Sequence, residues 1–120
     1  MAIANPLVLT YNAGTKSLVR INQDQYGSEY YLREATQDFR VKIRHSKESA
    51  QKNGVVLERH NVELTQTVFG VSGAPDEVMQ VYVVVRNAKT STSANVAKLG
   101  DALSAFLDNT HYQDLTNWVN

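Results

Sequence analysis

The sequence predicts an α+β fold, made of an N-terminal β-hairpin, an antiparallel sheet of about five strands and two C-terminal helices. In residues 7–87, short segments with alternating apolar and polar residues follow one another, which is the pattern of strands with one buried face. After Lys89 the apolar residues recur at helical spacing instead. A chain of 120 residues is expected to form a single domain, with the hairpin in 1–22, the sheet in 26–88 and the helices in 92–119.

The first strands predict the hairpin. Leu7–Tyr11 and Leu18–Ile21 are short apolar segments, and the Asn-Ala-Gly-Thr sequence of residues 12–15 between them is typical of a tight turn. Gly27–Leu32, which is rich in aromatic residues, is the third predicted strand.

The fourth predicted strand, Phe39–Ser46, reads FRVKIRHS and has two very different faces. Val41 and Ile43 share one face, which can pack on a core. The other face carries a row of three cations: Arg40, Lys42 and Arg44. Like charges two residues apart repel, so this row favours contact with a polyanion. The alternative is a solvated face balanced by acids on neighbouring strands, for which Glu58 and Glu63 are the candidates.

The next predicted strand covers about residues 55–68 and follows a Lys-Asn-Gly turn. Its apolar parity changes along the strand, from Val55 and Leu57 at odd positions to Val62 and Leu64 at even ones. A β-bulge near Glu58–Asn61 would explain this change.

A loop, Gly70–Pro75, leads to the last predicted strand, Glu77–Asn87. One face of this strand is apolar, with Met79, Val81, Val83 and Val85. The other face is more polar, with Gln80, Tyr82, Val84 and Arg86.

The helical end of the chain begins after N-cap candidates in Thr90–Ser93. One apolar stripe follows, formed by Val96, Leu99, Leu103, Phe106 and Leu107. We expect this helix to end near Asn109, and a second short helix to hold Leu115, Trp118 and Val119. Two helices at one end cannot cover the apolar face of the whole sheet, so we expect them to pack partly on a second copy of the chain.

Composition restricts the kinds of partner. The chain has 12 Lys and Arg and 12 Asp and Glu residues, so its formal net charge is zero and it is not a generic basic protein. Any RNA or DNA would therefore be bound by one organised face. The absence of cysteine excludes disulfides and thiolate chemistry. No unbroken apolar run is long enough to span a membrane, and no secretory signal precedes the first strand, so we expect no membrane span and a cytosolic location.

Five phrases of the chain resemble the coat proteins of the small single-stranded RNA bacteriophages, the leviviruses, and in particular that of a Caulobacter RNA phage. The phrases are Arg20–Asp24 (RINQD), Ser28–Leu32 (SEYYL), Phe39–Ser49 (FRVKIRHSKES), Glu58–Glu63 (ERHNVE) and Tyr82–Arg86 (YVVVR). With a weaker similarity in the C-terminal helices, the resemblance covers residues 16 to 118. None of the phrases is a catalytic signature.

The resemblance implies a capsid protein that forms an intertwined homodimer. The two sheets would join edge to edge, and the helices of each chain would cross onto its partner. Such dimers would assemble into an icosahedral shell that packages single-stranded genomic RNA on the inner sheet face. The same face would bind an operator hairpin if the protein also acts as a translational repressor. The implied location is the virion, assembled in the cytoplasm of a bacterial host.

By position, the resemblance implies an RNA-binding face on three strands. Its residues would be Arg40, Lys42, Arg44, Arg59, Asn61, Gln80, Tyr82 and Arg86. The cations would neutralise phosphates, Tyr82 would stack on an unpaired base, and Asn61 and Gln80 would bond base edges. Because of the parity change, the sequence does not decide whether Arg59 and Asn61 lie on this face. Gly70–Pro75 would be the loop at the symmetry axes of the shell, or else an ordinary surface loop.

Other ionisable groups have simpler interpretations. His45, His60 and His111 have no spaced partner, which favours buried or half-buried structural histidines; His60 could also face its own symmetry mate in a dimer. Four acids near strand ends could bind Ca²⁺ between subunits or remain solvated: Asp24, Glu29, Glu34 and Asp38. We assign no metal ligands and no cofactor.

Two further functions stay open. One is a stand-alone dimeric RNA-binding regulator that uses the same face and forms no shell. The other is an enzyme or small-ligand protein with a pocket between the sheet and its helices. No nucleophile elbow, phosphate-binding loop or dinucleotide fingerprint supports catalysis, so we expect no enzymatic activity and no small-molecule substrate.

Overall fold

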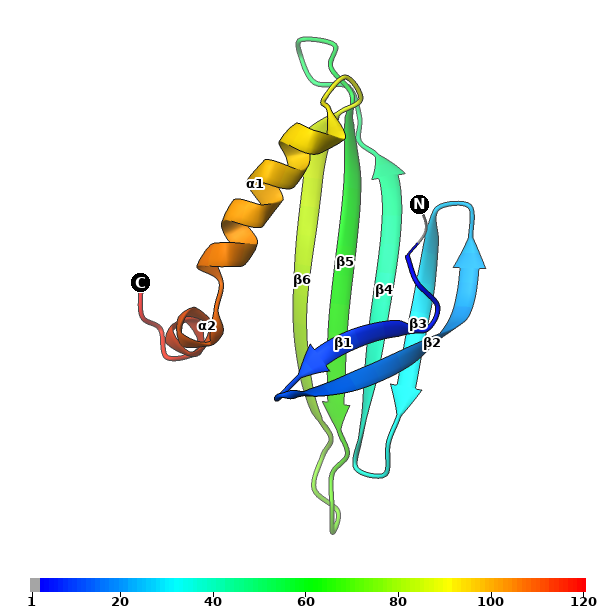
Figure 1. The fold of residues 1–120 in the computed structure, drawn as a ribbon, viewed down its shortest axis with the longest axis vertical. Coiled ribbons are helices and arrows are strands. Elements are labelled where there is room, and N and C mark those ends of the chain that lie inside the picture. Colours follow the sequence, from blue (N-terminus) through cyan, green and yellow to red (C-terminus); the bar gives the residue numbers. More distant parts are fainter. Residues whose placement is uncertain (1–2) are drawn as a thin grey trace.

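The computed structural model describes residues 3–120 and has a curled antiparallel sheet followed by two helices (Figure 1). The strands are β1 (Leu7–Tyr11), β2 (Gly14–Asp24), β3 (Gly27–Arg33), β4 (Gln37–Lys47), β5 (Leu57–Val68) and β6 (Glu77–Ala88). They lie side by side in chain order, and each pairs only with its neighbours in sequence. The α+β prediction is confirmed, but the sheet has six strands rather than about five, because both hairpin strands join it.

The N-terminal hairpin folds over one face of the sheet. β1 and β2 meet at Asn12 and Ala13, which both have left-handed backbone angles, as a two-residue hairpin turn requires. The register of β2 against β3 shifts between Arg20 and Asn22. Such a bulge bends a strand. The first half of β2 and all of β1 accordingly cross in front of β4 and β5 (Figure 1).

The hydrophobic core lies between this hairpin and the sheet. Its buried side chains are Leu18, Tyr30, Phe39, Val41 and Ile43, and Leu7, Leu9, Leu32 and Leu64 pack against them. We call this side of the sheet the apolar face; it carries Val41 and Ile43 of β4 and the residues opposite them, Leu64 and Val62 of β5. The reverse side is the polar face.

The predicted bulge near Glu58–Asn61 is wrong. β5 pairs with β4 and with β6 in unbroken register over its whole length. The apolar parity changes because Leu57, opposite Ala88, lies on the polar face, whereas Val62 and Leu64 lie on the apolar face. Without an extra residue in β5, Arg59 and Asn61 keep the parity of the polar face.

Both helices begin at capped residues. α1 (Ser93–Phe106) follows Thr92, whose side chain accepts a hydrogen bond from the Asn95 amide. It ends before Leu107, earlier than the predicted Asn109, because Asp108 caps α2 (Asn109–Thr116) by accepting from the His111 amide. Trp118 and Val119, which were predicted in the second helix, lie beyond its end.

The helices stand beside the sheet and do not cover it. In Figure 1, α1 runs along the outer side of β6. Within residues 3–120 neither helix buries a residue, and Leu99 in the apolar stripe of α1 is 76% exposed. The groove between α1 and β6 has mainly apolar walls, with Arg86 as the ionisable side chain among the described residues that line it. No helix of this part of the chain is long and apolar enough to cross a membrane.

Candidate nucleic-acid interface

The strand register brings all eight candidate residues onto the polar face. Residues directly opposite each other in an antiparallel pair point to the same side of a sheet. The cross-strand rows are Arg40–Thr65–Gln80, Lys42–Glu63–Tyr82, Arg44–Asn61–Val84 and Ser46–Arg59–Arg86. Arg59 and Asn61, whose face the sequence did not decide, therefore lie on the same surface as the other six candidate residues.

Strand β3 extends this surface with two residues that sequence reasoning did not assign to it. Glu29 lies opposite Lys42, and Tyr31 lies opposite Arg40. The Arg40 guanidinium sits 4.7 Å from the centre of the Tyr31 ring, a cation–π contact. The Tyr31 hydroxyl donates to Asp38 at 2.8 Å, and this hydrogen bond raises the pKa of Tyr31. Alternation along β3, combined with its register to β4, is the signal that would have found both residues.

The cations of this face are paired with acids of the same chain. Arg40 forms an ion pair with Glu29, and Arg44 lies 3.3 Å from Asp24. Lys42 has an acid opposite it on each side, Glu29 and Glu63. The face is therefore charge-balanced along β4, as the simpler interpretation of the cation row expected.

The balancing acids are only partly those predicted from the sequence. Glu63 does lie on the polar face, where it accepts a hydrogen bond from Gln80. Glu58 does not: it lies opposite Lys47 and Asn87 on the apolar face, because β5 has no bulge to change its parity.

A second charged group lies at the end of the face near the β4–β5 connection. Arg59 and Arg86 are directly opposite each other, and like charges in that position repel. Glu48 compensates by accepting two hydrogen bonds from Arg86, at 2.6 and 2.7 Å. These bonds, with the nearby positive charges of Arg86 and Arg59, lower the pKa of the Glu48 carboxyl.

The chemical capacity of the face follows from its exposure. Tyr82 is 62% exposed, so its ring is accessible for stacking, and the amide of Gln80 is exposed beside it. Exposed ion pairs are worth about 0–1 kcal/mol, so a phosphate can replace a carboxylate as the partner of an arginine at little cost. The face can thus hold anions, planar rings and hydrogen-bonding groups in one plane.

The histidines lie elsewhere. His45 and His60 face each other across β4 and β5 on the apolar face. His60 is half-buried as predicted, but His45 is exposed, because it lies beyond the part of the sheet that the hairpin covers. His111, half-buried on α2, contacts Asp108 at 2.8 Å and the ring of Phe106.

The four acids near strand ends do not form a cluster. Each has its own partner: Asp24 with Arg44, Glu29 with Arg40, Glu34 with Lys16, and Asp38 with Tyr31. Over residues 3–120, no group of three or more His, Cys, Asp or Glu side chains is arranged to hold a metal ion.

The loop between β5 and β6 depends on one close backbone approach. A Cβ atom at Gly70 would lie 1.9 Å from the Ala74 carbonyl oxygen, so only glycine fits there. The Gly70 amide donates to Asp76 at 2.8 Å, and Ser72 and Gly73 have left-handed backbone angles. The loop is therefore closed by specific contacts.

Comparison with known proteins adds one finding. A family model described as "Phage phiCb5, coat protein" matches residues 4–88, which include all six strands and end before α1. A search of curated proteins found no match.

Proposed function

The chain belongs to the phage phiCb5 coat protein family, and from that premise we propose that it forms homodimers that assemble into an icosahedral shell and package single-stranded RNA. Membership of the family gives the protein a structural role in the capsid of a virion. Assembly would take place in the cytoplasm of the bacterial host.

The exposed edge of strand β6 favours the proposed dimer. It is the last strand of the sheet and pairs on one side with β5, so its other edge offers twelve residues of backbone to a further strand. Its apolar-face side chains Met79, Val81 and Val83 are all exposed. A long, apolar, unpaired edge is an aggregation hazard unless something covers it. Pairing of β6 with β6 of a second copy would extend the sheet across both chains.

Helix α1 supports the same arrangement. Its apolar residues Leu99, Leu103 and Phe106 are exposed although they form one stripe. The helix lies at the β6 edge, where a second copy would bring its own uncovered apolar face. Each helix could then cover the partner's sheet, and the exposed stripe and the exposed strand would bury each other.

The single observation that carries the RNA proposal is the register, which collects eight candidate residues on the face opposite the hairpin. In the proposed shell this polar face points inward. Tyr82 would stack on an unpaired base, contributing about 1–3 kcal/mol. Asn61 and Gln80 would bond base edges, and Arg40, Lys42, Arg44, Arg59 and Arg86 would contact phosphates. A hairpin bound at the same residues would make the dimer a translational repressor.

Electron microscopy of the purified protein, together with its absorbance ratio at nucleic-acid and protein wavelengths, tests this proposal. We expect uniform particles that contain RNA. Small soluble species alone, across a range of ionic strengths with and without RNA or divalent ions, would contradict the shell. A species that remains a dimer when saturated with a short RNA hairpin would instead identify a stand-alone regulator.

A further inference from the structure

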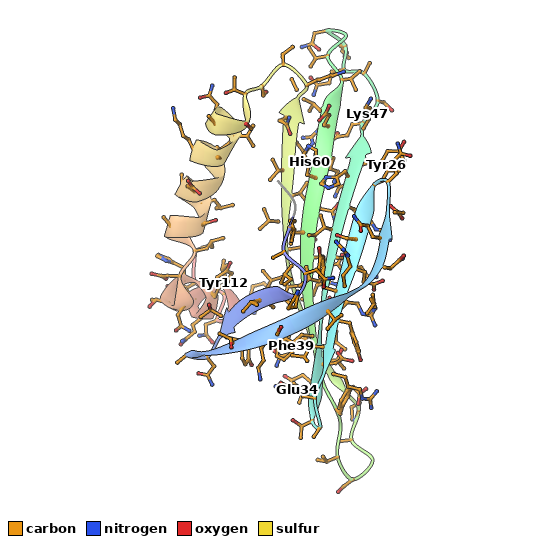
Figure 2. All side chains as sticks on the ribbon, turned by 45° about the vertical axis from the view of Figure 1, so that its right-hand side comes forward. Tyr26, Glu34, Phe39, Lys47, His60 and Tyr112 are labelled. Carbon is orange, nitrogen blue, oxygen red and sulfur yellow. The ribbon has the colours of Figure 1, made fainter. Side chains whose placement is uncertain are left out.

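The end of the apolar face that the hairpin does not cover carries a pair of histidines. His45 on β4 and His60 on β5 are directly opposite each other. Figure 2 shows His60 in the same half of the molecule as Tyr26 and Lys47, with Phe39 and Glu34 in the other half. An open pocket surrounds the pair, and Tyr26, Ser46 and Lys47 are among the residues that line it.

The two imidazoles meet through the same ring atom. The Nδ1 atoms of His45 and His60 are 2.8 Å apart, the distance of a hydrogen bond in which one Nδ1–H donates to the other Nδ1, and the ring planes are inclined by 65°. The Glu58 carboxylate lies 3.6 Å from Nε2 of His60, on the far side of that ring. A carboxylate there favours a proton on Nε2, which leaves a lone pair on Nδ1 of His60, facing His45.

The same spacing also fits two neighbouring ligands of one metal ion, which would take the place of this hydrogen bond. Two nitrogens about 2.0 Å from an ion and 90° apart are about 2.8 Å from each other, whereas tetrahedral ligands would be about 3.3 Å apart. Imidazole nitrogens suit copper, nickel and zinc, and a right-angled arrangement is typical of Cu²⁺ or Ni²⁺. We propose that His45 and His60 form a two-histidine site for a tetragonal divalent transition metal, Cu²⁺ or Ni²⁺.

The surroundings decide how the site works. Glu58 acts as a positioning residue that orients the His60 ring, as carboxylates do behind many metal-bound histidines. The open pocket leaves room for water at the remaining coordination positions. Because no third side-chain ligand is arranged nearby within residues 3–120, and because Lys47 and Arg44 add positive charge to the pocket wall, the affinity is modest. The two histidines lie on the face opposite the candidate RNA-binding residues, of which Arg44 also lines the pocket, and the site does not depend on the proposed function.

Titration of the purified protein with Cu²⁺, followed by electron paramagnetic resonance, tests the proposal. A buffer that does not coordinate copper keeps Cu²⁺ available to the protein and adds no nitrogen ligand of its own to the spectrum. We expect one equivalent of bound copper per chain, with splitting from two nitrogen ligands. A spectrum without nitrogen splitting in the unaltered protein would overturn the site, and this measurement needs no variant to fold.

Matched variants locate the site. His45→Gln and His60→Gln should each weaken Cu²⁺ binding at least about tenfold, and Glu58→Gln should weaken it by a smaller factor, because this carboxylate lies 3.6 Å from His60 and binds no metal itself. His111→Gln, which removes the third histidine from α2, should leave binding unchanged. If His45→Gln binds copper as well as the unaltered protein does, or if His111→Gln loses as much, the proposal is wrong. RNA content of the protein should be the same in all four variants, which separates this test from that of the RNA face.

Discussion

The two halves of the sheet differ in what covers their apolar face. Around β3 and β4 the chain covers its own apolar face with the hairpin, and Phe39 is 1% exposed. Around β6 nothing in residues 3–120 does so, and Val81 is 49% exposed although it continues the same cross-strand rows. Similar alternating sequences therefore end in opposite environments. The covered half can therefore be stable within one chain, whereas the other half is suited to a second copy.

The largest expected effect comes from the covered half. Phe39→Ala removes a ring that packs against Tyr11 and the core, and it should lower the free energy of unfolding by about 3–5 kcal/mol. Urea unfolding at several protein concentrations measures this. The matched change Phe106→Ala lies on the exposed stripe of α1. It should lower the free energy of unfolding by less than Phe39→Ala at low protein concentration, and its effect should grow as the concentration rises. Equal, concentration-independent losses would remove the distinction between the halves.

A charge placed in the uncovered half tests its proposed cover. Val81→Lys would bury an unpaired ammonium group in the dimer, at a cost of about 3 kcal/mol or more, so dimer dissociation should increase at least about a hundredfold. Analytical ultracentrifugation measures this change. Val8→Lys is the control, because Val8 is 58% exposed on the hairpin of the covered half. A dimer unaffected by Val81→Lys would place the subunit contact elsewhere.

The comparison extends to the two faces of β4. The triple change Arg40→Ala, Lys42→Ala and Arg44→Ala should leave the dimer folded but reduce RNA uptake. Since each phosphate contact with a single strand contributes about 0.7 to the slope of log affinity against log salt, the slope should fall by about 2. Filter binding at several salt concentrations measures it.

The control for this triple variant removes three exposed lysines outside the candidate face, Lys47, Lys52 and Lys89. It loses the same charge, so an equal fall in the slope would mean that only net charge matters. A triple variant that fails to fold, while its residual particles keep their RNA, would assign the row a structural role.

The smallest expected effect is a pH dependence that distinguishes two ion pairs. Lys16 lowers the pKa of Glu34 in the covered half, and Arg86 lowers that of Glu48 beside the polar face. A carboxyl whose pKa is lowered by folding stabilises the protein above its unfolded pKa, and this contribution disappears as pH falls through the folded pKa. Glu34→Gln and Glu48→Gln should therefore each be less stable than the parent at pH 6, and the differences should vanish in acid.

Bound RNA should change the stabilising contribution of Glu48 but not that of Glu34. If a phosphate takes Arg86, the Glu48 contribution at pH 6 should shrink when RNA is bound, whereas that of Glu34 should stay. Thermal unfolding with and without RNA at both pH values measures this. A Glu48 contribution that RNA does not change would indicate that Arg86 keeps its carboxylate partner and contacts no phosphate.

Much of the fold could be predicted because local patterns decide it. Apolar, aromatic or alternating segments indicated all six strands, and the turn at residues 12–15 placed the hairpin. The bend of β2 could not be predicted, since its register shift between Arg20 and Asn22 leaves no trace in the alternation. The end of α1 was missed because Asp108, which caps the next helix, reads equally well as part of a continuing one.

The candidate site was predictable to the extent that parity along a strand sufficed. Parity placed the residues of β4 and β6 on one face, but Arg59 and Asn61 needed the register of β5, where a single apolar residue, Leu57, gave a misleading signal. Of the acids that balance the face, Glu63 was a candidate from the sequence, whereas Glu29, Asp24 and Glu48 were not. Glu48 and Arg86 are 38 positions apart, and only the folded chain brings them together.

The chain-order topology has a consequence for how the protein is made. Every strand pairs with the one synthesised just before it, so the sheet can grow by adding one hairpin at a time as the chain leaves the ribosome. Such local pairing favours rapid folding. The core between the hairpin and β4 is complete before β6 and α1 emerge. The exposed apolar surfaces of β6 and α1, which we assign to the dimer, are therefore synthesised last, and this shortens the time they spend without a partner.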